Sequence, residues 1–183
     1  MRKIFYALIC IQISFLLLLC GCTRKETTKQ GFEYYITSGY NYTLKDGKAV
    51  LIEKTVNKDD EIINLPDEID GYPVIGIGRY HYTFIYGETT RGMFENNESI
   101  KTVVLPSKLE MLDSQVFNWS SIQCIEFPNT LCNVGQFALS SCVYLTDVKF
   151  GEGLKTISMG MFSHCTAPVS YTHLRAHETR GNL

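Results

Sequence analysis

The C-terminal half of the sequence repeats itself every 22 or 23 residues, in the segments 100–121, 122–144 and 145–166. Apolar residues recur in the same columns of all three segments, and one such column holds Val103, Ile125 and Val148. The other columns hold Ile100, Ile122 and Leu145; Leu105, Phe127 and Phe150; Leu112, Val134 and Ile157; and Phe117, Leu139 and Phe162. A unit of this length cannot bury its own apolar residues, so successive units must stack around a common core.

Each unit opens with alternating inward and outward residues, as in residues 102–105 (TVVL), and this alternation predicts a short strand. Strands of successive units then pair in a parallel sheet, about 4.8 Å apart. Pro106 and Pro128 end two of these strands because proline lacks a backbone donor, and Gly151 holds the third place. We therefore predict a leucine-rich-repeat solenoid in which short parallel β-strands stack in a right-handed coil.

The pattern I-x-x-V-x-L-P, followed by a second aliphatic residue and then by phenylalanine with a small residue or cysteine three positions later, resembles BspA-like leucine-rich repeats. Residues 63–78 resemble the usual first unit of that family, including the phrase IDGYPV at positions 69–74. Residues 79–90 depart from the pattern as an insertion in this first unit. The predicted repeat domain spans residues 63–167.

Residues 34–62 are predicted to form an N-terminal β-hairpin cap. Two apolar-rich stretches, 42–44 and 49–52, flank Asp46-Gly47, a turn pair that is favoured in hairpins. Such a hairpin would cover the open end of the first coil, as the ends of solenoids require.

The N-terminus is typical of an export signal. Arg2 and Lys3 precede an uncharged apolar run over residues 4–19, and the sequence LCGC at 19–22 resembles the lipobox of bacterial lipoproteins. We predict a signal peptide over 1–21, a lipid on Cys22 that binds the membrane, and a polar tether over 22–33. The predicted location is outside the cell membrane, with the chain lipid-anchored to the bacterial envelope. An uncleaved anchor and plain secretion are the alternative interpretations.

The C-terminal tail, residues 168–183, contains His173 and His177, whose spacing on a helix would suit a metal site. However, residues 168–179 (PVSYTHLRAHET) resemble the translation of a transposon-end adapter used in sequencing libraries. We predict that this tail is non-native, that it holds no metal site, and that the natural protein continues with further repeats.

Cys142 and Cys165 share a repeat column one coil apart, which allows either a disulfide or two buried thiols. Cys124 and Cys132 are predicted to face solvent, and without a CxxC pair we expect no metal and no cofactor. The acidic runs at 59–61 and 67–68 lack the spacing of a calcium loop, which favours solvated turns. No nucleophile-elbow motif occurs, so we predict that the chain is not an enzyme.

The outward strand columns are the first candidate binding surface. One column holds Thr102, Cys124 and Asp147, and the other holds Val104, Glu126 and Lys149. We predict an ion pair between Glu126 and Lys149 on neighbouring strands.

The insertion is the second candidate, since Tyr80, Tyr82, Phe84 and Tyr86 place four aromatics within seven residues. The alternative is that some of these rings pack onto the first coil.

A regular, extended surface suits macromolecular partners better than small molecules. The formal net charge of −2 gives no indication of nucleic-acid binding. The family resemblance implies a surface lipoprotein that adheres to host matrix proteins, other extracellular proteins or neighbouring cells. The alternative hypothesis is a targeting module of a larger secreted or surface enzyme.

Overall fold

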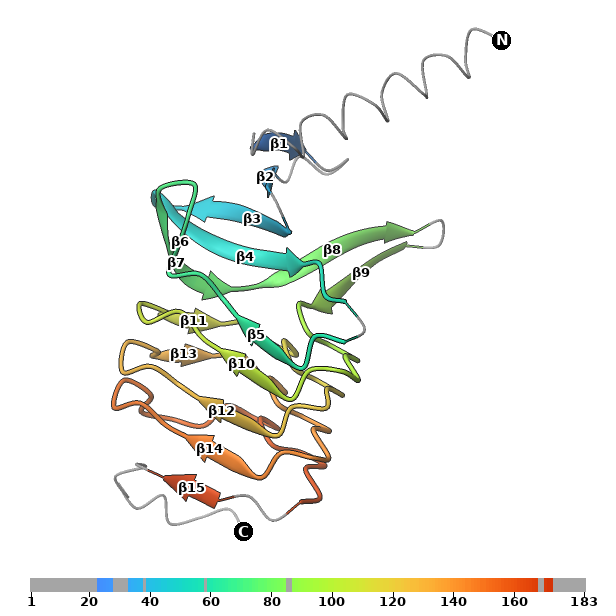
Figure 1. Cartoon of the computed structure of the whole chain (residues 1–183), viewed down its shortest axis with the longest axis vertical. Helices are drawn as coiled ribbons and strands as arrows, with labels where there is room; N and C mark the ends of the chain where they lie inside the picture. The colour runs from blue at the N-terminus through green and yellow to red at the C-terminus, as the bar shows by residue number, and fades with distance from the viewer. Residues whose placement is uncertain are drawn as a thin grey trace, which may run out of the picture.

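The computed structural model describes residues 23–27, 33–37, 39–57, 59–84, 87–167 and 170–172, and of residues 79–90 and 171–172 it describes the backbone alone. The predicted signal peptide, Cys22, Tyr86, His173 and His177 lie outside the described residues. The repeats form coils stacked one below another, beneath an N-terminal group of longer strands (Figure 1).

One side of every coil contributes a strand to a five-stranded parallel sheet. In spatial order its strands are β5 (Ile62–Asn64), β10 (Thr102–Val104), β12 (Cys124–Glu126), β14 (Asp147–Lys149) and β15 (Ser170–Thr172). Val103 pairs with Ile63 on one side and with Ile125 on the other, and Ile125 pairs with Val148. These four side chains are at most 3% exposed, so the predicted interior row is confirmed.

The opposite side of the coils forms shorter parallel pairs. Here β7 (Tyr72–Ile77), β11 (Met111–Leu112) and β13 (Asn133–Val134) lie side by side. Leu112 and Val134 are buried as predicted, but Ile157 in the same column is 47% exposed. Next to Val134 the described chain forms no further strand, and the Ser158 hydroxyl donates to the Val134 carbonyl instead. Within the described residues, no further coil covers Ile157.

The turns between the two sides stack through a third ladder of backbone hydrogen bonds. The N–H groups of Phe94, Phe117 and Leu139 each donate to a carbonyl of the next coil, at 2.8–3.0 Å. Two residues after each phenylalanine or leucine the backbone is left-handed, as at Trp119 (φ 58°) and Ser141 (φ 58°). The first three coils are therefore joined to one another on three sides.

The third unit carries Gly151 at the place where the first two units carry Pro106 and Pro128, because a side chain has no room at this place in the third unit. A Cβ at this position would lie 2.3 Å from the carbonyl oxygen of Pro128 in the preceding coil. Glycine permits this close approach of two backbones.

The predicted cap hairpin is confirmed, with β3 (Tyr40–Lys45) and β4 (Lys48–Lys54) joined at Asp46-Gly47. Both turn residues have positive φ (51° and 72°), as a two-residue hairpin turn of the favoured type requires. β4 then pairs parallel with β7, so the cap extends the sheet of the first coil. A further short strand, β6 (Glu68–Ile69), folds back onto β7.

Part of the segment predicted as a polar tether forms a strand. Within residues 22–33, β1 (Arg24–Thr27) pairs antiparallel with β2 (Glu33–Thr37), which in turn pairs with β3. An ion pair between Lys25 and Glu33 at 2.8 Å accompanies this ladder. A polar stretch can form such a strand because the ladder is made by backbone groups, whatever the side chains are.

The insertion is a β-hairpin of β8 (Arg79–Phe84) and β9 (Gly87–Gly92), which forms a separate two-stranded sheet. In Figure 1 it reaches sideways beyond the stacked coils.

The segment predicted as a non-native tail contributes the strand β15, whose residues Ser170–Thr172 pair in register with Asp147–Lys149. The origin of the tail sequence stays a prediction.

Candidate functional site

A groove of about 570 Å³ lies over the outward face of β10, β12 and β14. All five predicted strand-face residues line it, namely Thr102, Val104, Glu126, Asp147 and Lys149. The structure therefore brings together the residues that the repeat alignment placed in the two outward columns. The stacking of coils sets this arrangement, since each strand is in register with the next.

The first outward column carries small polar groups. Thr102, Cys124 and Asp147 are register partners on adjacent strands, and Ser170 continues the column on β15. The Thr102 hydroxyl oxygen lies 3.1 Å from the Cys124 sulfur, within hydrogen-bonding distance. The Asp147 carboxylate accepts a hydrogen bond from the Thr146 hydroxyl at 2.7 Å.

The second column is apolar at one end and charged at the other. Val104 is 49% exposed. The Lys149 ammonium lies 2.7 Å from the Glu126 carboxylate, so the predicted cross-strand pair is confirmed. Both side chains are at least half exposed, and such a pair contributes about 0.2–1 kcal/mol to stability.

Sequence reasoning missed part of the groove wall. Cys124 is not among the missed residues, because the repeat alignment places it in an outward column. The missed residues are Leu105 and Pro128, at the ends of their strands, and Ser170 of the tail predicted to be non-native.

The strand that carries three of the insertion's aromatic residues belongs to a different sheet from the groove. Tyr80, Tyr82 and Phe84 lie on β8, which pairs with β9 in its own sheet. The groove belongs to the five-stranded sheet. The two predicted surfaces are thus separate, and the role of the aromatics stays a prediction.

The four cysteines of the repeats are free thiols. Cys142 is buried and donates to the Phe117 carbonyl at 3.0 Å, and the half-buried Cys165 donates to the Leu139 carbonyl at 3.2 Å. These two bonds are equivalent, one coil apart, so each thiol ties its coil to the preceding one. Burial raises the pKa of Cys142 to about 11.

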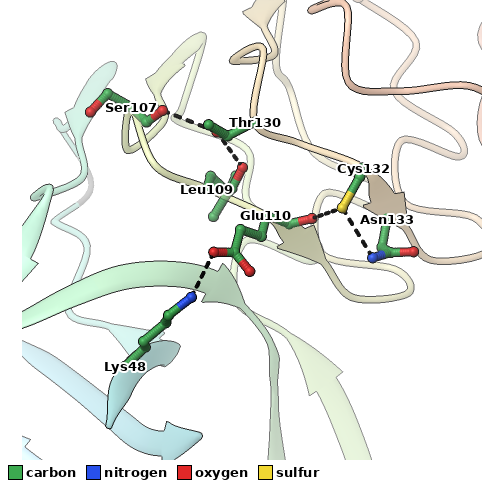
Figure 2. A network of polar contacts seen from close by, with 7 residues as sticks. All are labelled: Lys48, Ser107, Leu109, Glu110, Thr130, Cys132 and Asn133. Carbon is green, nitrogen blue, oxygen red and sulfur yellow. Dashed lines mark hydrogen bonds and ion pairs between the residues drawn. The ribbon is translucent and has the colours of Figure 1, made fainter. Parts of the chain in front are cut away.

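Cys132 lies on the other side of the coils, in a polar network that links the cap to the repeats (Figure 2). Lys48 of the cap forms an ion pair with Glu110 at 2.9 Å, and the Cys132 thiol donates to the Glu110 carbonyl at 3.4 Å. Asn133 donates to the Cys132 sulfur at 3.3 Å. Thr130 lies within 3.0 Å of two carbonyls of the preceding coil, those of Ser107 and Leu109. Unlike Cys142, Cys132 is exposed.

The acidic runs accept hydrogen bonds from backbone N–H groups, Asp60 within its own turn and Asp67 from the next coil. Asp60 accepts from the Asn57 N–H at 2.8 Å, and Asp67 accepts from the Ser107 N–H at 2.6 Å. The bond from Ser107 lowers the pKa of Asp67 below its usual range. Over the described parts of the chain, no three His, Cys, Asp or Glu side chains gather as metal ligands would. In the same residues, no helix has the length and apolar character needed to cross a membrane.

The fold is that of a leucine-rich repeat protein, with stacked parallel strands and one continuous core. Residues 88–178 match the family described as "BspA type Leucine rich repeat region", in six copies. This part of the chain is a BspA-type leucine-rich repeat region.

Three solved structures resemble parts of the chain. A T. pallidum leucine-rich repeat protein is 22% identical, with 77% of this chain and 68% of that chain covered and a TM-score of 0.48. A leucine-rich repeat protein from Bacteroides ovatus is 18% identical, with 69% and 43% covered and a TM-score of 0.36. A leucine-rich cell surface protein from Faecalibacterium prausnitzii is 13% identical, with 68% and 56% covered and a TM-score of 0.28. None of the curated proteins matches the chain.

The different exposure of Cys132 and Cys142 predicts the order in which the two thiols are alkylated. In the folded protein at pH 8, iodoacetamide should modify the exposed Cys132 first and Cys142 only after unfolding, because Cys142 is buried and its raised pKa suppresses the thiolate. Mass spectrometry of peptides after timed quenching measures this order. Equal rates at the two positions would contradict the packing described for Cys142.

Proposed function

We propose that the chain is a cell-surface binding protein whose ligand is another protein, bound on the outward face of β10, β12 and β14. The observation that carries this proposal is the groove, whose wall contains every outward residue predicted on the three strands. An open surface that joins an exposed apolar side chain with charged ones is typical of protein-binding sites on repeat proteins.

The proposed location rests on the N-terminal sequence. Export with a lipid on Cys22 would hold the repeats at the outer side of the membrane, where extracellular proteins and neighbouring cells are available as partners. We propose the aromatic hairpin β8–β9 as a second contact, since tyrosine and phenylalanine supply large contact areas at interfaces.

Binding can be tested with the full chain purified in mild detergent and a panel of extracellular-matrix proteins, using biolayer interferometry. For a partner that binds, Lys149→Glu should change the affinity about tenfold or more, weakening it for an acidic partner surface and tightening it for a basic one, because it reverses the charge of a groove residue and leaves Glu126 without its cation. Lys155→Glu is the matched control, since Lys155 is exposed and does not line the groove.

Equal affinities for the Lys149 and Lys155 variants would contradict binding in the groove. In the same assay, the double variant Tyr82→Ala/Phe84→Ala tests the hairpin, and unchanged affinity would remove the hairpin from the proposal.

Lipidation has its own test. Cys22→Ser should abolish incorporation of an alkyne-labelled fatty acid and release the protein from the membrane fraction, whereas Cys20→Ser should leave both unchanged. Retained labelling in the Cys22 variant would place the lipid elsewhere and contradict the predicted cleavage site.

A further inference from the structure

We infer that the groove binds an extended segment of the partner protein with two anchors, a basic side chain against Asp147 and an apolar side chain against Val104. This inference rests on the proposed function and adds to it the chemistry of the segment.

The charges of the groove favour a basic side chain. Three charged residues line it, and two of them, Glu126 and Lys149, neutralise each other at 2.7 Å. Asp147 accepts a hydrogen bond from the Thr146 hydroxyl, and no cation among the described residues pairs with it. A hydroxyl leaves the carboxylate charge in place, so the groove carries one uncompensated negative charge. Arginine or lysine from a partner would pair with it, and arginine could do so through two parallel hydrogen bonds.

The other end of the groove favours an apolar side chain. Val104 is 49% exposed there, and Leu105 and Pro128 line the same groove. Covering these carbon atoms removes apolar surface from water, which is favourable in proportion to the area buried. The charged and apolar ends thus select different side chains of one bound segment.

The distance between the two ends sets the spacing of those side chains. Val104 and Asp147 lie on β10 and β14 with β12 between them, and two positions apart along the strand register. Strand spacing of about 4.8 Å and a rise of about 3.3 Å per residue place them roughly 12 Å apart. An extended segment covers that distance in three or four residues.

A helix fits this groove less well than an extended segment. It would need about eight residues to cover the same distance at 1.5 Å per residue. A helix is also about 10–12 Å wide, more than twice the strand spacing of about 4.8 Å, so it would cover the neighbouring columns as well as the two anchors. The geometry therefore favours an extended segment.

The test uses capped peptides of defined sequence and the ¹⁵N-labelled full chain in detergent, followed by NMR. The probe peptides carry leucine and arginine three or four residues apart, in both orders, in a glycine–serine background. Matched peptides replace arginine with glutamate, replace leucine with alanine, or place the two anchors next to each other. The probe should shift the amide signals of Val104 and Asp147 and bind at least about fivefold more tightly than each matched peptide.

The carboxylate is tested by Asp147→Asn, which keeps the shape of the side chain and removes its charge. This variant should weaken binding of the probe about tenfold, as expected for the loss of a charge-assisted hydrogen bond. Glu98→Gln is the control, because it removes one exposed carboxylate outside the groove and should leave binding unchanged. The dispersion of the NMR spectrum confirms that each variant is folded.

The outcomes separate this inference from the proposed function. Equal or tighter binding of the glutamate peptide, or no effect of Asp147→Asn, would overturn the chemistry inferred for the segment and leave the groove as a binding site. If no peptide shifts the groove signals while matrix-protein binding still depends on Lys149, the two-anchor segment is wrong and the proposed function stands. If matrix-protein binding is also independent of Lys149, both are overturned.

Discussion

The structure depends on apolar burial between coils. Ile63, Val103, Ile125 and Val148 form one interior row, and none of them has enough neighbours inside its own coil to exclude water. Full burial of one such side chain contributes about 1.5–3 kcal/mol, and each coil gains it only when the next coil is in place. Backbone hydrogen bonds between neighbouring coils hold the row in register, and the Cys142 thiol adds a bond to the preceding coil.

The same register creates the candidate site. Because side chains alternate along a strand, the positions next to the interior row must face outward, and stacking brings them into columns about 4.8 Å apart. The columns differ in chemistry because outward residues carry no packing constraint. Thr102 and Asp147 stand in one column, and Val104 and Lys149 in the other. The core therefore fixes the place of the groove, while the outward residues determine what it binds.

The sequence predicts those features that depend on periodicity or on one local turn. Interior columns, the Asp46-Gly47 hairpin and the Glu126–Lys149 pair follow from alternation, turn chemistry and unit length. Other features have no such signal. Trp119 adopts a left-handed backbone without being glycine, because the stacked turns and not its own preference decide its conformation. Strand β1 is polar and pairs through its backbone, and the exposure of Ile157 depends on which coil covers it. The volume of the groove likewise requires three-dimensional coordinates.

The most direct test of coil stacking is a double-mutant cycle between Val103 and Ile125, measured by urea denaturation of the wild type, the two alanine variants and the double variant. If the side chains touch across adjacent coils, the losses in unfolding free energy should be non-additive, with a coupling of about 0.5–3 kcal/mol. Additive losses, within about 0.3 kcal/mol, would mean that the two residues do not share a core and would contradict the stacked architecture.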